Sequence, residues 1–187
     1  MIQLRIPFNV TKQRNQLQEL REKLRRIKRE ALYSNKAHLI ASRRNYRLHK
    51  RLCMLIILSN VAIGLVLTYI HIDGMLRWMW MCYTSAVLAF SAALLTMVLA
   101  KLNLPKSAEG HKAFAGRYDA IFSKCDLLQN SLVNNNVTEE VIQHKVLSCC
   151  SALEMLNEEQ FKLMPLRKDK TRAKKEIEAK SKGKRRS

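Results

Sequence analysis

Glycine and proline are scarce in this chain, whose 187 residues include only 5 Gly and 3 Pro. Because these residues interrupt helices, their scarcity favours long helices over sheets and linkers. The sequence also lacks a phosphate-binding glycine loop, a nucleophile elbow and an HExxH zinc motif. We therefore expect an all-α protein that is not an enzyme. We also expect it to need no cofactor, no metal and no small-molecule substrate.

The cysteines form no spaced disulfide framework, since two lie in apolar segments and three in the C-terminal part. Reduced thiols on the cytosolic side of a membrane fit this distribution. A metal site is disfavoured because neighbouring cysteines point to different helix faces and the spacing matches no standard zinc pattern. The residues considered for it are His111, Cys125, His144, Cys149 and Cys150.

Charged residues are missing from two long segments. Residues 52–72 and 78–100 contain no Lys, Arg, Asp or Glu, and only residues 73–77 separate them. A helix of about 20 apolar residues crosses the roughly 30 Å hydrocarbon core of a bilayer. Asp73 and Gly74 favour a chain reversal between the segments. The sequence therefore predicts a two-helix transmembrane hairpin with its turn at residues 73–77.

The charge is strongly positive, at +19 from 34 Lys and Arg against 15 Asp and Glu. Lys and Arg are frequent in residues 1–51 and after residue 100, whereas the turn carries only Arg77. The positive-inside rule then places both termini in the cytosol. The residues expected at the membrane interface, against lipid headgroups, are Arg43, Arg44, Tyr46, Arg47, Lys50, Arg51, Trp78 and Trp80.

Small and polar residues recur inside both apolar segments. In lipid, such residues let helices approach closely and bond to each other. They most simply allow the two helices of one hairpin to pack together. Alternatively, they line a water path through an oligomer. The residues concerned are Asn60, Gly64, Thr68, Ser85, Ala89 and Thr96.

The arms outside the membrane carry helix-pairing patterns. Residues 1–51 read as a long basic amphipathic helix, and no helix breaker prevents its continuing to residue 72. Residues 107–164 read as a cytosolic helical hairpin that reverses at the polar residues 134–136. Apolar positions alternate spacings of three and four, the seam by which helices pair. These seam residues are Leu17, Leu20, Leu24, Ile27, Phe114, Tyr118, Ile121, Leu128, Leu132, Ile142, Val146, Leu153 and Leu156.

Residues 165–187 form a basic tail with few apolar side chains, which we expect to be flexible alone. The tail either remains solvated or binds lipid, an acidic protein or nucleic-acid phosphates. The residues expected to contact an anionic partner are Arg167, Lys168, Lys174, Lys175, Lys184, Arg185 and Arg186.

The order of two motifs resembles a known family. SRRNYR at residues 42–47 enters the first apolar segment, and HKAFAGRYDAI at residues 111–121 follows the second. This order resembles the SLATT domains over roughly residues 31–156. The resemblance implies two transmembrane helices with a helical cytosolic extension. It also implies pore formation, as in effectors of prokaryotic conflict systems, and related modules occur in large DNA viruses.

The chain departs from the SLATT effector pattern because it has no sensor domain and adds a basic tail and a longer basic N-terminal arm. Two functions therefore remain open. In the first, the chain is an integral membrane scaffold that oligomerises through its helical arms, as an inner-membrane protein of a virion would. In the second, it is a SLATT-like pore-forming effector whose oligomer permeabilises a membrane.

Overall fold

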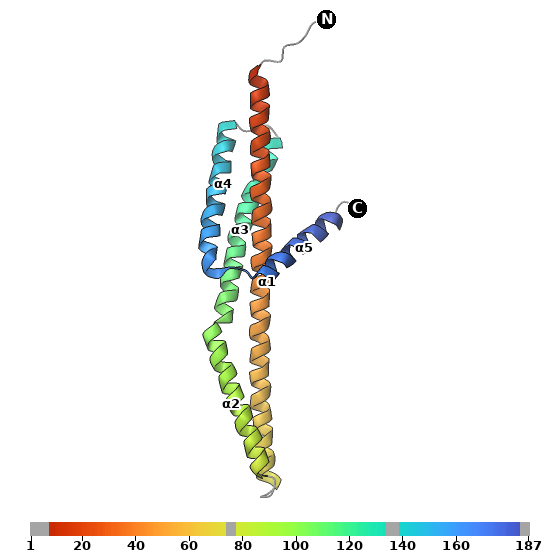
Figure 1. Ribbon diagram of the computed structural model, residues 1–187, viewed down its shortest axis with the longest axis vertical. Helices are drawn as coiled ribbons and strands as arrows, with labels where there is room; N and C mark the ends of the chain where they lie inside the picture. Colours follow the sequence, from red (N-terminus) through yellow and green to blue (C-terminus); the bar gives the residue numbers. More distant parts are fainter. Residues whose placement is uncertain (1–7, 74–77, 134–138, 184–187) are drawn as a thin grey trace. The chain divides into compact units, whose positions relative to one another are not determined.

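The computed structural model describes residues 8–73, 78–133 and 139–183, and this part of the chain is helical with no strand (Figure 1). The all-α fold class predicted from the sequence is confirmed. The turn was predicted at residues 73–77, of which Asp73 is the last residue of α1 and the others lie outside the described residues, as does the predicted break at residues 134–136. The helices are α1 (Phe8–Asp73), α2 (Trp78–Leu102), α3 (Leu104–Val133), α4 (Glu139–Glu159), the 3-10 helix η1 (Gln160–Leu163) and α5 (Arg167–Gly183).

Helix α1 is a single element of 66 residues, as the lack of helix breakers predicted. It contributes to two compact units, which we describe separately. The bundle unit consists of residues 1–41 and 110–187, and the apolar unit consists of residues 42–109.

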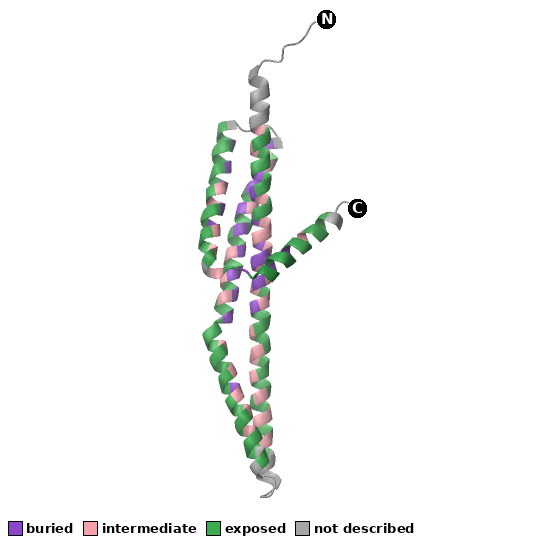
Figure 2. Ribbon diagram, in the orientation of Figure 1, coloured by how far each residue is buried: buried purple, intermediate pink, exposed green. Residues whose placement is uncertain are grey.

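The bundle unit is built on one apolar core shared by α1, α3 and α4 (Figure 2). Fully burying a Leu or Ile side chain contributes about 1.5–3 kcal/mol, so this core is the main source of stability in the unit. All of the seam residues named above lie in it. Leu17, Leu20 and Phe114 are partly buried, and the others are buried. The core also includes Ala31, Cys125 and Cys149.

One residue separates α2 from α3. Asn103 has φ 42°, in the left-handed region that asparagine tolerates better than most residues. Its carbonyl oxygen accepts a hydrogen bond from the Ser107 backbone N–H at 3.1 Å. Pro105 lies in the first turn of α3, where its missing N–H leaves no helical bond unmade. Helix α3 therefore begins at Leu104, earlier than the predicted boundary at residue 107.

In the apolar unit, α1 and α2 meet along a seam of half-buried positions spaced three or four apart. Two hydrogen bonds close one end of the unit. Ser42 Oγ donates to the Ala108 carbonyl at 2.8 Å, and Asn45 Nδ2 donates to Ser107 Oγ at 3.0 Å. The seam residues are Ile56, Ser59, Ile63 and Val66 in α1, and Ser85, Leu88, Ala92, Leu95 and Leu99 in α2.

This seam differs from the predicted one. Asn60, Gly64 and Thr68 are exposed, and a Cβ added at Gly64 would meet nothing within 4 Å. Ala89 and Thr96 are exposed as well, and only Ser85 of the predicted set lies in the seam. A strict four-residue spacing drifts around the helix, whereas alternating three and four keeps residues on one face. The prediction that the Asn60 stripe packs the two helices of one hairpin is therefore wrong for this unit.

Two helices are long and apolar enough to cross a membrane. Their most apolar windows, within Leu17–Thr68 and Cys82–Leu132, have mean hydropathies of 2.1 and 1.9. The buried share is 0 % in the first window and 11 % in the second. A core helix of a soluble protein would bury much of such a window, so the apolar surface here is unlike that of a soluble core.

The basic tail differs from the expectation of a segment without regular structure, because residues 167–183 form α5. The Leu166 backbone N–H donates to Asp169 Oδ2 at 3.2 Å, which is half of a capping box at the helix start. Ala173 is buried, which attaches α5 to the bundle unit. In the sequence, the signal for this helix is the capping residue Asp169 and not an apolar periodicity. The basic composition of the segment obscures that signal. Lys184, Arg185 and Arg186 lie outside the described residues.

Candidate functional site

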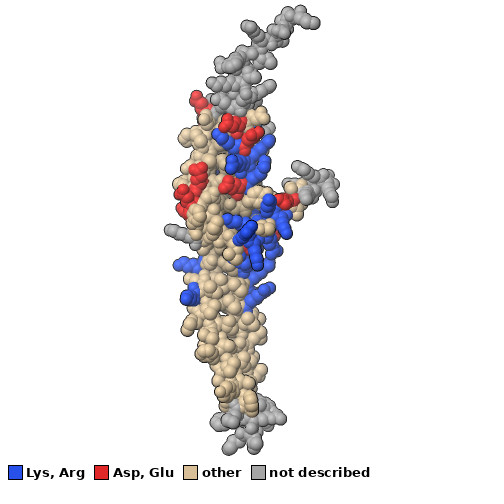
Figure 3. All heavy atoms as spheres, in the orientation of Figure 1, with Lys and Arg blue, Asp and Glu red and all other residues tan. Residues whose placement is uncertain are grey.

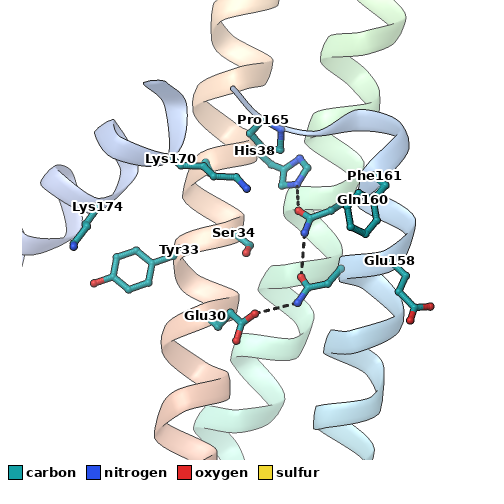
Figure 4. Close-up of a pocket in the computed structure, with 12 residues that line it drawn as sticks. Glu30, Tyr33, Ser34, His38, Glu158, Gln160, Phe161, Pro165, Lys170 and Lys174 are labelled. Atoms are coloured by element: carbon teal, nitrogen blue, oxygen red, sulfur yellow. Dashed lines mark hydrogen bonds between the residues drawn. The ribbon is translucent and has the colours of Figure 1, made fainter. Parts of the chain in front are cut away.

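The bundle unit contains a cleft of about 690 Å³ between α1, the end of α4, η1 and α5 (Figure 4). Its size is in the usual range for small-molecule pockets, roughly 300–1,000 Å³. The residues that line it are Glu30, Tyr33, Ser34, Ala37, His38, Asn157, Glu158, Gln160, Phe161, Pro165, Lys170 and Lys174.

A pair of buried histidines stands at one side of the cleft. His38 on α1 is 0 % exposed, and its Nδ1 lies 3.0 Å from Nδ1 of His111 on α3. The His38 ring also stacks on two aromatic rings. Its centroid lies 5.3 Å from that of Phe114 and 5.6 Å from that of Tyr118. A hydrogen bond between two Nδ1 atoms needs one donor and one acceptor, so both rings cannot carry a proton there.

A chain of hydrogen bonds fixes which ring donates. A carboxylate only accepts, so Asn157 Nδ2 donates to Glu30 Oε1 at 3.0 Å and leaves Asn157 Oδ1 as an acceptor. Asn157 Oδ1 then accepts from the Tyr118 hydroxyl at 2.7 Å and from Gln160 Nε2 at 3.3 Å.

The same direction continues to the histidines. Since Gln160 donates through its nitrogen, its Oε1 accepts from His38 Nε2 at 3.4 Å. Neutral His38 therefore holds its proton on Nε2, and its Nδ1 accepts from His111 Nδ1–H. In this series of hydrogen bonds, each group donates to the next one on the way to Glu30. Hydrogen bonds that run in one direction polarise and strengthen one another.

Burial changes the acidity of both central groups. Removal from water lowers the pKa of His38, an effect that the hydrogen bond to Gln160 opposes and the charge of Lys170 reinforces. Burial raises the pKa of Tyr118 to about 12. Both groups are therefore neutral near pH 7, and the site holds a polar network without ionic charge apart from Glu30.

Local sequence explains why His38 faces the core. Continuing the α1 seam from Ala31 by steps of four and three leads to Asn35 and His38. Asn35 is also buried, and its Nδ2 donates to the Ala115 carbonyl and to Asp119 Oδ1, each at 3.1 Å. On α3, one step of three back from Phe114 reaches His111. Because neither histidine is apolar, the apolar pattern ends before His38 and does not include His111. The sequence pointed to His111 only as a possible metal ligand, although it is buried.

Two lysines of α5 supply positive charge to the cleft. Figure 4 shows the Lys170 side chain pointing toward Ser34 and His38, while the Glu158 carboxylate points away. Lys174 follows four residues later, on the same face of α5 and near Tyr33. Within the described residues, neither ammonium has a carboxylate partner within 4.0 Å.

The predicted interface residues lie mainly on the surface. Tyr46, Arg47 and Arg51 are exposed, as are Arg43 and Lys50, and Trp80 is 81 % exposed. Arg44 is half-buried and its guanidinium donates to Asn45 Oδ1 at 3.3 Å. The side chain of Trp78 lies outside the described residues. Of the tail residues expected to contact an anionic partner, Arg167, Lys168, Lys174 and Lys175 are exposed on α5.

Among the residues that the structure describes, no group of three His, Cys, Asp or Glu side chains is arranged to hold a metal ion. The cleft can instead bind a ligand through cationic and polar groups set against apolar walls. Comparison with protein families, with characterised proteins and with solved structures finds no match to this chain.

Proposed function

We propose that the chain is a non-enzymatic integral membrane protein that acts as a scaffold. Residues 52–72 and 78–100 cross the bilayer as a hairpin, and the bundle unit is held on the cytosolic side. One observation carries this proposal, namely that the apolar unit leaves its large apolar side chains uncovered. Leu65, Phe90 and Met97 are 67 %, 69 % and 68 % exposed. Lipid is the environment in which such a surface is stable.

The ends of the apolar unit support the same arrangement. Arg47, Lys50 and Arg51 precede the first apolar segment, Lys101 follows the second, and all are exposed. Apart from Lys101 in its last turn, α2 contains no acidic or basic residue, and Figure 3 shows an extended face without such side chains over this unit. Juxtamembrane Lys and Arg attract anionic lipid headgroups by about 1 kcal/mol each. Both basic clusters would therefore lie at one membrane surface.

The hydroxyl groups inside the apolar unit favour a scaffold over a pore. Thr68 Oγ1 donates to the Gly64 carbonyl at 2.8 Å, and Thr96 Oγ1 donates to the Ala92 carbonyl at 2.8 Å. Ser85 Oγ likewise donates to the Cys82 carbonyl at 2.9 Å. Hydroxyls bonded to their own helix need no water, so they tolerate contact with lipid or with another helix.

Exposed groups in both units support self-association. Asn60 places an exposed carboxamide in the middle of an apolar segment, where a second copy can satisfy it. In the bundle unit, Leu127, Leu147 and Met155 are 67 %, 61 % and 59 % exposed. We propose that the scaffold is a homo-oligomer, and that α5 binds an acidic protein or nucleic-acid phosphates.

Asn60 also supports the second candidate, a SLATT-like pore. An exposed carboxamide could line a water path once several copies assemble. The two candidates differ in whether the oligomer conducts ions. Native mass spectrometry in detergent and conductance across planar bilayers, both on the full chain, separate them.

For the scaffold we expect an oligomer without steady ion conductance, and we expect Asn60→Leu to lower the oligomer fraction. Leu58→Ala is the control, because it changes a neighbouring exposed position without adding or removing a polar group. A conductance that Asn60→Leu abolishes and Leu58→Ala preserves would establish the pore instead. A chain that stays monomeric at every concentration contradicts both candidates.

A further inference from the structure

The cleft beside His38 carries an inference that is independent of the membrane proposal. We propose that this cleft is a binding site for a phosphate monoester that bears an aromatic or acyl group. The argument rests on the charges of α5, on the apolar walls and on the size of the cavity.

Lys170 and Lys174 provide the charge. They lie four residues apart on one helix face, and both line the cleft. Together they carry two positive charges, which match the charge of about −1.5 to −2 on a phosphate monoester near pH 7. Lysine binds phosphate as a compact point charge with three donors. Tyr33 also lines the cleft.

Two acidic residues, Glu30 and Glu158, line the cleft as well. Glu30 is already an acceptor for Asn157 Nδ2 at 3.0 Å, at the end of the network opposite the histidines. Glu158 points away from the cavity in Figure 4. The neutral state of His38 adds no charge. Glu30 keeps its negative charge, so an anion is favoured beside Lys170, which Figure 4 shows apart from that carboxylate.

The remaining walls fit an apolar group. Ala37, Phe161 and Pro165 line the cleft, and Phe161 is 75 % exposed although it is a large aromatic residue. An aromatic or acyl group seated against Phe161 would remove that surface from water. A volume of about 690 Å³ admits a phosphate together with such a group. Inorganic phosphate alone would leave the apolar wall unused.

The position of the lysines is fixed by the fold. Asp169 accepts from the Leu166 backbone N–H at 3.2 Å and holds the first turn of α5, from which Lys170 extends. Ala173 is buried on the inner face of the same helix, between the two lysines in sequence. The bundle unit thus presents both ammonium groups on a helix that is already attached, which reduces the entropic cost of binding.

The test is isothermal titration calorimetry on the full chain in uncharged detergent micelles. Phenyl phosphate and dihexanoyl phosphatidic acid are the two probes, one soluble and one a lipid. Phenol and inorganic phosphate each lack one half of the proposed ligand. We expect at least one probe to bind with saturation, and at least about tenfold more tightly than either phenol or inorganic phosphate. Binding of phenyl phosphate indicates a soluble ligand, and binding of phosphatidic acid alone indicates a lipid headgroup.

Matched charge variants of α5 locate the site. Lys170→Gln should weaken binding at least about tenfold, as loss of a charge-assisted contact does. Lys175→Gln changes the net charge equally at an exposed position outside the cleft, and it should change affinity less than about twofold. Circular dichroism checks that both variants keep their helices. Absence of binding by both probes, or equal losses in the two variants, overturns the proposal.

Discussion

Acidification should open the bundle unit, and the buried histidine pair sets the expected size of the effect. The groups that face His38 are His111, Phe114 and Tyr118 of α3, Gln160 of η1 and Lys170 of α5. None of these is an anion that would stabilise a protonated His38. Charging both rings would also break the Nδ1–Nδ1 hydrogen bond, because both nitrogens would then be donors. The folded bundle therefore resists protonation at this position.

The sign of the pH effect follows from the lowered pKa of His38 in the fold. In the unfolded chain this histidine has a pKa near 6.5, so below pH 6.5 the unfolded state binds more protons than the folded state. Stability is then fully present above pH 6.5 and is lost as the pH falls toward the folded pKa. One group changes stability by at most about 1.4 kcal/mol per pH unit. Between pH 7.5 and 5.5 we therefore expect a loss of at most about 1.4 kcal/mol.

The buried thiol of Cys125 reports this opening. Cys125 is 0 % exposed, and burial raises its pKa to about 12, so it reacts only when the core opens. Its labelling by a maleimide in the full chain, located by mass spectrometry, gives a protection factor relative to a free thiol at each pH. Protection should fall from pH 7.5 to 5.5, by at most about tenfold.

Two variants decide whether His38 is the cause. His38→Gln keeps a donor and an acceptor but does not titrate, so Cys125 protection should become nearly independent of pH. His144 is exposed on α4, and His144→Gln should keep the full pH effect. Protection that is unchanged or higher at pH 5.5 in the original chain would refute the reasoning. An equal pH effect in His38→Gln would do the same.

Two further predictions concern packing. Leu153→Ala removes a buried side chain from the bundle core and should lower the free energy of opening by about 2–5 kcal/mol, read from the same Cys125 labelling; a change below about 1 kcal/mol would mean that this core does not hold the unit together. Ala92→Leu overfills the seam between α1 and α2, where Ala92 is 6 % exposed, and should cost about 1–3 kcal/mol. Ala93→Leu places the same group on the exposed face and should be nearly neutral, so equal shifts in the thermal unfolding midpoint of the two variants would contradict the seam.

The parts of this fold that were most readily predicted are those marked by long apolar segments or by a regular spacing of apolar residues. The absence of charge in residues 52–72 and 78–100 required helices of membrane length, and the lack of breakers required a continuous α1. The bundle core follows from the alternation of three and four, because that spacing keeps side chains on one helix face. These features depend on many residues acting together, so no single substitution hides them.

Features that depend on single polar residues were missed. His38 sits at a seam position but is not apolar, so an apolar pattern ends before it. Asp169 starts α5 through one hydrogen bond in a segment whose composition predicts disorder. The stripe of Asn60, Gly64 and Thr68 was misplaced because small size is only one requirement for helix contact. The actual seam combines Ser59 and Ala92 with larger residues such as Ile56 and Leu95.

The central claim, a hairpin that crosses the membrane and returns, is tested most directly by cysteine accessibility in cell membranes. A membrane-impermeant maleimide is applied to intact cells and to inverted vesicles that contain Lys50→Cys, Trp80→Cys or Lys101→Cys, three positions that are exposed in the fold. The account predicts that Lys50→Cys and Lys101→Cys react only in inverted vesicles, whereas Trp80→Cys reacts from outside intact cells. Reaction of Lys50→Cys and Lys101→Cys from opposite sides of the membrane would contradict it.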